Sequence, residues 1–378
     1  MKNRKGLAWL IAVLAVLSFL AAACGSDSDG ASSSNGEGDS TTTAASSEGP
    51  DTSGYADLSA SLDGQGSSFQ DTFQQQVSSD FNGLVSDAGG SAAVTYTKTG
   101  SSDGKKALAD ETVDFAGSDS PIKEEEMASF GDREVLYFPL VGGPITVSFN
   151  LEGIDTLNLG PDTIAKIFQT EITSWDDEAI AADNPDVDLP STPVTVVHRS
   201  DGSGTTKNFT KWLTEAAPDT WTLDSGEEVE WDAKTTGAEK STGVTAVIKD
   251  TDGAVGYVDL ADAAKEGLTV AAIGNASGDF VDPTPDSASA ALGAADIADD
   301  LTYDPLNADA EGAYPITSPT WMLVDKVQAD EATAESLKAY LAYVLTTGQE
   351  QAKTLLYAPL PAELAEKAVA QIDEITVG

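Results

Sequence analysis

Cysteine and histidine are almost absent from this chain, which has one of each, Cys24 and His198, in 378 residues. A single cysteine excludes an internal disulfide, and the two residues together cannot form a zinc site of the cysteine and histidine type. No nucleotide-binding Gly-x-x-x-x-Gly-Lys loop is present either. We therefore expect no metal and no cofactor.

Basic residues are scarce as well, because 20 Lys and Arg stand against 63 Asp and Glu, giving a formal net charge of −43 at pH 7. A chain of this charge is repelled by nucleic acid and by anionic membranes, so neither is an expected partner. The acidity is compatible with a saline habitat, where salt screens the repulsion, and equally with an ordinary acidic exported protein.

Long apolar runs are limited to one, Leu7 to Leu20, which follows three basic residues and ends in alanines. Residues 1–23 are typical of an export signal peptide and too short for a lasting transmembrane helix. Cys24 follows directly, at the position where a lipoprotein signal peptidase cleaves and a diacylglycerol is attached. Ala21 stands where leucine is more usual, and a buried thiol is the alternative. We expect a protein lipid-anchored to the outer face of the cytoplasmic membrane.

The segment from Gly25 to Gly54 has no aromatic residue and no Val, Ile, Leu, Met, Lys or Arg, so it cannot form a core. We interpret residues 24–55 as the lipidated cysteine and a flexible linker. About 320 residues remain, which favours two domains or lobes over a single core.

Three places combine glycine and hydroxyl residues just before a segment with helical apolar spacing. They are Gly64 to Phe69 before Phe73 and Val77, Gly100 to Gly104 before Ala107 and Leu108, and Ser200 to Thr206 before Phe209, Trp212 and Leu213. Helix N-termini bind anions because free backbone amides and the helix dipole direct positive charge outward. A single serine in such a place is more often a plain N-cap, but three such places indicate a set of donors for one small oxyanion.

Two charged residues refine this hypothesis. Arg199 offers a planar fork that suits two oxygens, and Asp201 could hold that fork in place; a surface ion pair is the alternative. Asp119 lies in the segment Val113 to Pro121, which is predicted as a short strand that ends in a polar turn. A carboxylate facing an anion there fits only a ligand with a proton to donate. At neutral pH phosphate has such a proton and sulfate does not.

These motifs, together with Val113 to Pro121, Gly253 to Val258 and Tyr314 to Ser318, resemble the phosphate-binding protein of Pst-type ABC transporters, in the same order over residues 60 to 370. The resemblance implies an α/β, bilobed periplasmic-binding-protein fold with a two-segment hinge. It implies extracytoplasmic capture of inorganic phosphate, delivery to the permease and ATPase subunits of an ABC importer, and no enzymatic activity. By position, the implied phosphate-binding residues are Ser68, the Phe69 amide, Ser101 and Asp119, with Arg199, Ser203 and the amides of Gly204 and Thr205, and with Asp201 pairing Arg199.

The sequence departs from this family at two of these places. Ser68 stands where threonine is usual and loses a methyl group. Asp103 replaces a usual glycine, and its charge either weakens binding or points outward. A monomer is expected.

Two extended segments, Leu136 to Gly143 and Tyr314 to Ser318, predict the two crossings between lobes. The first lobe would combine residues 56–140 with 317–378, and the second would be 141–316. The second lobe has its own candidate core residues, which are Ile164, Ile167, Phe168, Trp175, Val196, Phe209, Trp212 and Val258. Residues 329–345 and 362–372 are predicted helices that return to the first lobe.

The main competing function from another class is a hydrolase that uses Ser203. Strand alternation would send His198 and Arg199 to opposite faces, so His198 should not serve as a base for Ser203. Within the binding proteins, the sequence also leaves open a site for sulfate, molybdate or arsenate, and a surface protein that senses phosphate.

Overall fold

The computed structural model describes residues 52–378. The predicted signal peptide, Cys24 and almost all of the predicted linker lie outside the described residues. The helices of the described part are α1 Asp71–Ala88, α2 Ser101–Ala109, α3 Glu124–Met127, α4 Pro161–Phe168, α5 Glu178–Asp183, α6 Gly204–Ala216, α7 Lys240–Asp250, α8 Leu260–Glu266, α9 Pro285–Ala294, α10 Glu331–Leu345 and α11 Ala362–Gln371. Its strands are β1 Ser61–Gly66, β2 Ala93–Lys98, β3 Phe115–Ser118, β4 Val135–Asn150, β5 Asn158–Leu159, β6 Thr195–Arg199, β7 Thr236–Ala238, β8 Ala254–Asp259, β9 Thr269–Val270, β10 Ala272–Gly274, β11 Phe280–Val281, β12 Thr317–Asp325, β13 Val327–Gln328 and β14 Thr376–Val377.

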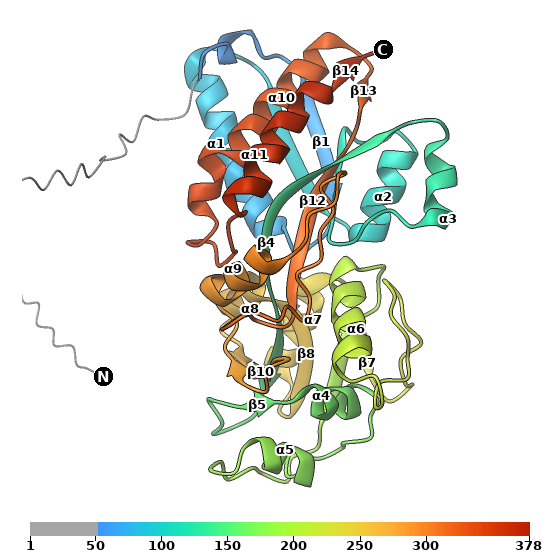
Figure 1. The fold of residues 1–378 in the computed structure, drawn as a ribbon, viewed down its shortest axis with the longest axis vertical. Helices are drawn as coiled ribbons and strands as arrows, with labels where there is room; N and C mark the ends of the chain where they lie inside the picture. Colours follow the sequence, from blue (N-terminus) through green and yellow to red (C-terminus); the bar gives the residue numbers. More distant parts are fainter. Residues whose placement is uncertain (1–51) are drawn as a thin grey trace, which may run out of the picture. The chain divides into compact units, whose positions relative to one another are not determined.

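The main sheet has two halves that share one strand. Its order is β2-β1-β3-β12-β4-β8-β6-β7, and β9 also pairs with β4. The first part of β4 pairs with β12, whereas residues 145–150 pair with β8. We call the half with β1, β2, β3 and β12 the first lobe and the half with β6, β7 and β8 the second lobe. The two lobes lie one above the other, with β4 running between them (Figure 1). The predicted bilobed α/β fold is confirmed.

The first predicted crossing segment lies within β4, which is longer than its sequence suggests, whereas the second is a strand only at Thr317 and Ser318, where β12 begins. Pro139, Gly142, Gly143 and Pro144 all lie inside this 16-residue strand. The pairing of β4 with β12 shifts by one residue between Thr320 and Trp321. Such a bulge bends and twists the strand pair, which lets one strand pass from one half of the sheet to the other.

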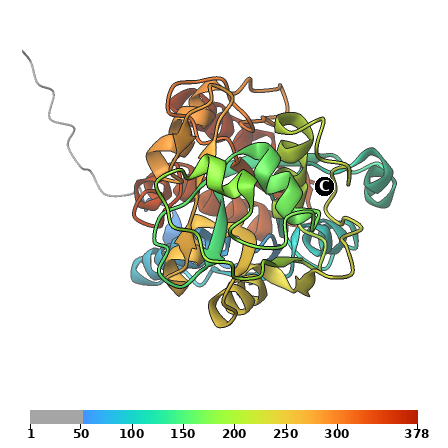
Figure 2. The same cartoon turned by 90° about the horizontal axis from the view of Figure 1, so that it is seen from below.

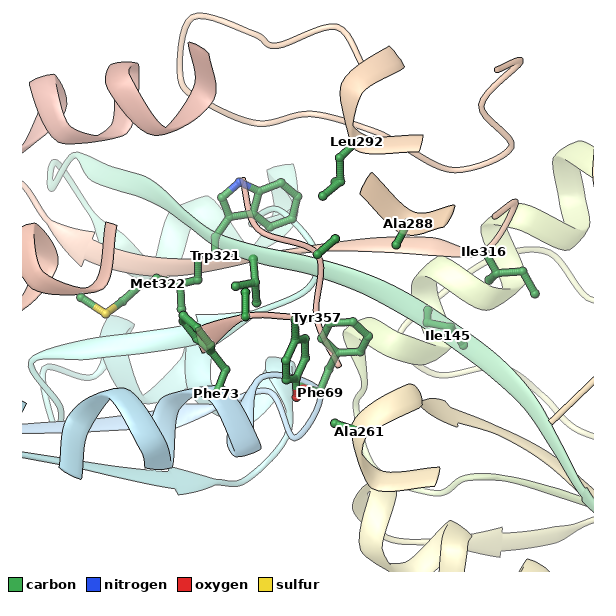
Figure 3. Packing of buried hydrophobic residues seen from close by; sticks show 14 of the residues in the cluster. Phe69, Phe73, Ile145, Ala261, Ala288, Leu292, Ile316, Trp321, Met322 and Tyr357 are labelled. Atoms are coloured by element: carbon green, nitrogen blue, oxygen red, sulfur yellow. Dashed lines mark hydrogen bonds between the residues drawn. The ribbon is translucent and has the colours of Figure 1, made fainter. Parts of the chain in front are cut away.

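The core of the first lobe positions the segment that precedes α1. The Tyr357 hydroxyl donates to the Phe69 carbonyl oxygen at 2.6 Å, and the two rings meet edge to face with centroids 5.9 Å apart. Figure 3 shows both rings beneath β4, with Phe73 alongside. Phe73 and Val77 of α1 are buried as predicted, but α1 begins at Asp71, three residues after Ser68.

The second lobe has the core that its sequence predicted, because all eight candidate residues are buried. Phe209 of α6 stacks on Tyr257 of β8 with ring centroids 4.5 Å apart. α4 and α5 lie at the end of this lobe that faces away from the first lobe (Figures 1 and 2). The core therefore holds α6, whose first turn faces the first lobe, against the sheet.

The C-terminal part returns to the first lobe, where α10 contacts α1 and β1. The predicted helices 329–345 and 362–372 correspond to α10 and α11. Tyr55, at the end of the predicted linker, is buried against Phe81 with ring centroids 5.4 Å apart. In residues 52–378, no helix has the length and apolar character needed to cross a membrane.

Candidate functional site

The first lobe contributes a turn between β1 and α1 that carries the buried residues Ser67 and Ser68. Gly66 enters the turn with a φ of 146°, and a Cβ there would lie 2.1 Å from the Gly117 carbonyl oxygen, so the turn requires glycine. The Phe69 amide, a predicted donor, donates to the Ser67 hydroxyl at 3.0 Å. The Ser67 hydroxyl therefore fixes the position of the Phe69 amide.

A second element of the first lobe, α2, begins at Ser101 as predicted. Ser101 is fully buried, and its hydroxyl accepts from the Asp119 amide at 3.4 Å. Gly100 precedes the helix with a φ of 108°, and a Cβ there would lie 2.8 Å from the Gly202 carbonyl oxygen of the second lobe. Asp103 is exposed, so its additional charge points outward from the site.

The carboxylate of Asp119 lies at the centre of the site, directly after β3, with 1% of the residue exposed. The Ser67 hydroxyl lies 2.6 Å from both carboxylate oxygens. Thr320 of β12 donates to Oδ1 at 2.7 Å, and Thr205 of the second lobe donates to Oδ2 at 3.4 Å. Hydroxyl groups from three separate segments thus converge on one acceptor.

Burial dominates the ionisation of this carboxylate. It raises the pKa of Asp119 from 3.8 to about 6, although the Ser67 and Thr320 hydrogen bonds and the charge of Arg199 lower it. Near neutral pH the group is therefore a charged acceptor close to its titration range.

Arg199 supplies the strong cation of the site from the end of β6, with 4% of the residue exposed. Its Nε donates to Asp201 Oδ1 at 2.7 Å, and its Nη2 pairs with Asp201 Oδ2. Its Nη1 donates across the lobes to the Ser68 hydroxyl at 3.1 Å. Burial raises the pKa of Asp201, but the hydrogen bonds and charge of Arg199 lower it more, so the pKa lies below its ordinary value. Asp201 therefore fixes the orientation of the guanidinium, as predicted.

The N-terminus of α6 brings the remaining predicted residues to Asp119. Ser203 is the N-cap, and its hydroxyl accepts from the Thr206 amide at 3.2 Å. A Cβ on Gly204 would lie 2.7 Å from the Ser101 hydroxyl and 2.8 Å from Asp119 Cβ. The first turn of α6 thus abuts the first lobe so closely that only glycine fits between them.

Sequence reasoning missed three hydroxyl residues that belong to this cluster: Ser67, Thr320 and Ser241. The Ser241 hydroxyl lies 3.0 Å from the Ser68 hydroxyl, and the Ser241 amide donates to it at 3.3 Å. Ser241 lies in the first turn of α7, in a Lys-Ser-Thr-Gly segment. This is a fourth case of the glycine and hydroxyl pattern at a helix start, so a signal for it was present.

His198 lies away from these residues. Its ring stacks on Trp231 with centroids 4.9 Å apart, and its Nδ1 lies 2.8 Å from the Arg199 carbonyl oxygen. Between residues 52 and 378, no hydrogen bond joins His198 to Ser203, and no cluster of His, Cys, Asp and Glu is suited to a metal ion. The geometry thus gives no nucleophile and base pair at Ser203.

Comparison with known proteins shows the family of this chain. A family model of a PBP superfamily domain matches residues 38–347. The phosphate-binding protein PstS of Xylella fastidiosa is 33% identical over 315 residues, covering 82% of this chain and 84% of that protein. The phosphate-binding protein PstS 3 of Mycobacterium tuberculosis is 32% identical over 383 residues, covering 99% of each.

Solved structures share the fold at lower identity. A high-affinity periplasmic phosphate-binding protein, PfluDING bound with phosphate, superposes with a TM-score of 0.69 at 21% identity, covering 82% of this chain and 94% of that one. A phosphate-binding protein from Stenotrophomonas maltophilia superposes with a TM-score of 0.64 at 20% identity, covering 82% and 93%. The two-lobed arrangement is therefore common to this chain and these proteins.

Proposed function

This chain belongs to the PstS-type phosphate-binding proteins of the PBP superfamily, and we propose that it captures inorganic phosphate outside the cytoplasm for an ABC importer. Members of this family bind phosphate for transport and are not enzymes, which removes the hydrolase alternative. The partners of the loaded protein would be the permease and ATPase subunits of the importer. The protein would act as a monomer.

The observation that carries the proposal is the buried Asp119 carboxylate among hydroxyl and guanidinium donors from both lobes. Phosphate would donate its proton to Asp119 and accept from the other groups. The first lobe would contribute Ser68, Ser101 and the Phe69 amide. The remaining donors would be Arg199, Ser203 and the amides of Gly204 and Thr205, with Asp201 orienting Arg199.

A calorimetric titration of the purified protein with phosphate and sulfate at pH 7.5 tests this function. Sulfate has no proton to donate to Asp119, so one of its oxygens would face the carboxylate with no hydrogen bond between them. The wild type should therefore bind phosphate more tightly than sulfate by about 10⁴-fold or more. Asp119→Asn adds an amide donor, so it should reduce that preference and bind sulfate measurably better. Comparable affinities for the two anions in the wild type, or an unchanged ratio in Asp119→Asn, would refute the proton-reading role.

The lobes would close over phosphate about the two crossings. We place the lobe borders at residues 140 and 316, within and beside the strands β4 and β12 that join the halves. Phosphate would stabilise the closed form because the groups that donate hydrogen bonds to it come from both lobes. The direct contacts of Arg199 with Ser68 and of Thr205 with Asp119 support this closure.

The attachment of the protein to the membrane rests on Cys24. We propose that residues 1–23 are removed, that Cys24 is lipidated, and that the linker holds the binding lobes at the outer face of the cytoplasmic membrane. Cys24→Ala should abolish labelling by a radioactive fatty acid in cells while phosphate binding persists. Continued labelling of that variant would disprove the anchor.

A further inference from the structure

Glu227 is a buried carboxylate that belongs to neither the predicted site nor the core. It lies in the segment between α6 and β7, with 2% of the residue exposed. Its carbonyl oxygen accepts from the Ser203 amide at 3.1 Å. The backbone of Glu227 is thus fastened to the second lobe directly behind the N-terminus of α6.

The side chain of Glu227 bonds across the cleft to the first lobe. Its Oε1 accepts from Lys105 Nζ at 2.7 Å and from the Ser120 hydroxyl at 2.5 Å. Its Oε2 accepts from the Ser102 hydroxyl at 2.9 Å and lies 3.2 Å from Lys123 Nζ. All four side-chain partners are in the first lobe, whereas the carboxylate comes from the second.

These partners are sequence neighbours of the proposed phosphate ligands. Ser102 follows Ser101, Ser120 follows Asp119, and the backbone bond holds Ser203. One residue therefore connects three segments of the site from outside it. Burial raises the pKa of Glu227, but Lys105 and the other partners lower it more, to about 2, so the carboxylate is charged at neutral pH.

The contacts of Glu227 favour the closed form specifically. If the lobes separate, Glu227 loses all four side-chain partners and is hydrated, while Lys105 keeps its other partner, Glu126, at 2.8 Å within the first lobe. An interaction made in only one of two conformations shifts the equilibrium toward that conformation. Two of these partners, Ser102 and Lys105, belong to α2, which lies above α6 in Figure 1.

We propose that Glu227 is a positioning residue that clamps the two lobes beside the phosphate site and so sets the lifetime of the phosphate complex. This inference rests on the proposed function. The clamp does not touch phosphate. It acts by holding the segments of Ser101, Asp119 and Ser203 at their bonding distances in the closed form.

Stopped-flow kinetics and calorimetry with phosphate on the purified full-length protein test the clamp. Glu227→Ala leaves Lys105 buried beside the cleft without its interlobe partner, so phosphate affinity should fall about 30-fold or more, mainly through faster dissociation. Glu227→Gln keeps the volume and can still bond the serines, so its loss should be smaller, about tenfold. The exposed neighbour Glu230→Gln is the matched control and should behave as wild type.

A double-substitution cycle separates clamping from a general structural role. Lys105→Gln should also speed dissociation, and its effect should not add to that of Glu227→Gln, because both remove the same contact. The ratio of phosphate affinity to sulfate affinity should stay unchanged in every variant, since none of them changes Asp119. If Glu227→Ala does not fold, the two glutamine variants decide the question.

Failure of the proposed function and failure of the clamp would give different results. A wild type that does not bind phosphate would refute the proposed function itself. A wild type that binds phosphate, with dissociation rates of Glu227→Gln and Lys105→Gln within threefold of it, would overturn the clamp alone. Fully additive effects of the two substitutions would also overturn it.

Discussion

At Asp119, burial and hydrogen bonding act on the same carboxylate in opposite directions. Burial prevails, and the pKa of about 6 exceeds the ordinary 3.8. The folded protein therefore holds this proton more tightly than the unfolded chain does. Its contribution to stability is fully present below about pH 4 and is lost as the pH rises through 6, by about 3 kcal/mol in total.

We predict that Asp119→Asn removes this component of the pH dependence. In phosphate-free buffer, the melting temperature of the variant minus that of the wild type should be larger at pH 7.5 than at pH 4. Differential scanning calorimetry of both proteins at both pH values measures this difference in melting temperature. Taking the difference cancels the effect of groups that titrate alike in both proteins. Equal differences at the two pH values would show that burial of Asp119 does not govern its ionisation.

The pKa of Glu227 is shifted in the opposite direction, to about 2 from 4.5. Its contribution to stability is therefore present above pH 4.5 and is lost as the pH falls through about 2. The two carboxylates act in separate pH ranges, so acid effects on the clamp do not mimic those on Asp119.

Among the elements, α6 lies very close to the opposite lobe at Gly204. We predict that Gly204→Ala weakens phosphate binding by about 5- to 150-fold, because its methyl group would lie 2.7 Å from the Ser101 hydroxyl and force the lobes apart. The helix itself tolerates alanine, so calorimetric unfolding should show no loss of stability in the second lobe.

Gly83→Ala in α1 is the matched control for this substitution, since no atom lies within 4 Å of its added Cβ. It should leave the phosphate affinity unchanged and stabilise the helix slightly. Wild-type affinity in Gly204→Ala would mean that the closed form does not bring α6 against Ser101.

Local sequence patterns predicted the elements of the site well, because capping and apolar spacing are local properties. They predicted the starts of α2 and α6 and the pairing of Arg199 with Asp201. The first helix, α1, begins at Asp71, just after the predicted segment Gly64 to Phe69. The continuity of β4 was not predictable, because the prolines and glycines within it normally indicate a break.

Local sequence patterns could not predict the contacts between segments that are far apart in the sequence. Thr320 and Asp119 are 201 positions apart, and Glu227 and Lys105 are 122 positions apart. No local spacing connects these residues, since only the folded sheet brings them together. The resemblance to a family supplied the proposed phosphate ligands, whereas the contacts of Thr320 and Glu227 follow only from the three-dimensional arrangement.

At the scale of the whole molecule, the net charge of −43 opposes the approach of an anion. The Debye length, beyond which charges are largely screened, is about 30 Å at 0.01 M salt but only about 8 Å at 0.15 M. Added salt therefore weakens this repulsion. Because Asp201 already pairs Arg199 and the site is buried, little positive potential reaches the solvent from it.

We therefore predict that the association rate of phosphate rises with ionic strength, by about tenfold between 0.01 M and 0.2 M sodium chloride. The dissociation rate should change little, because buried contacts are screened much less than exposed ones. Stopped-flow measurements across this range give both rates. An association rate that falls with salt would contradict the prediction. It would mean that the lysines beside the cleft, Lys207 and Lys211, direct the anion inward more strongly than the acidic surface repels it.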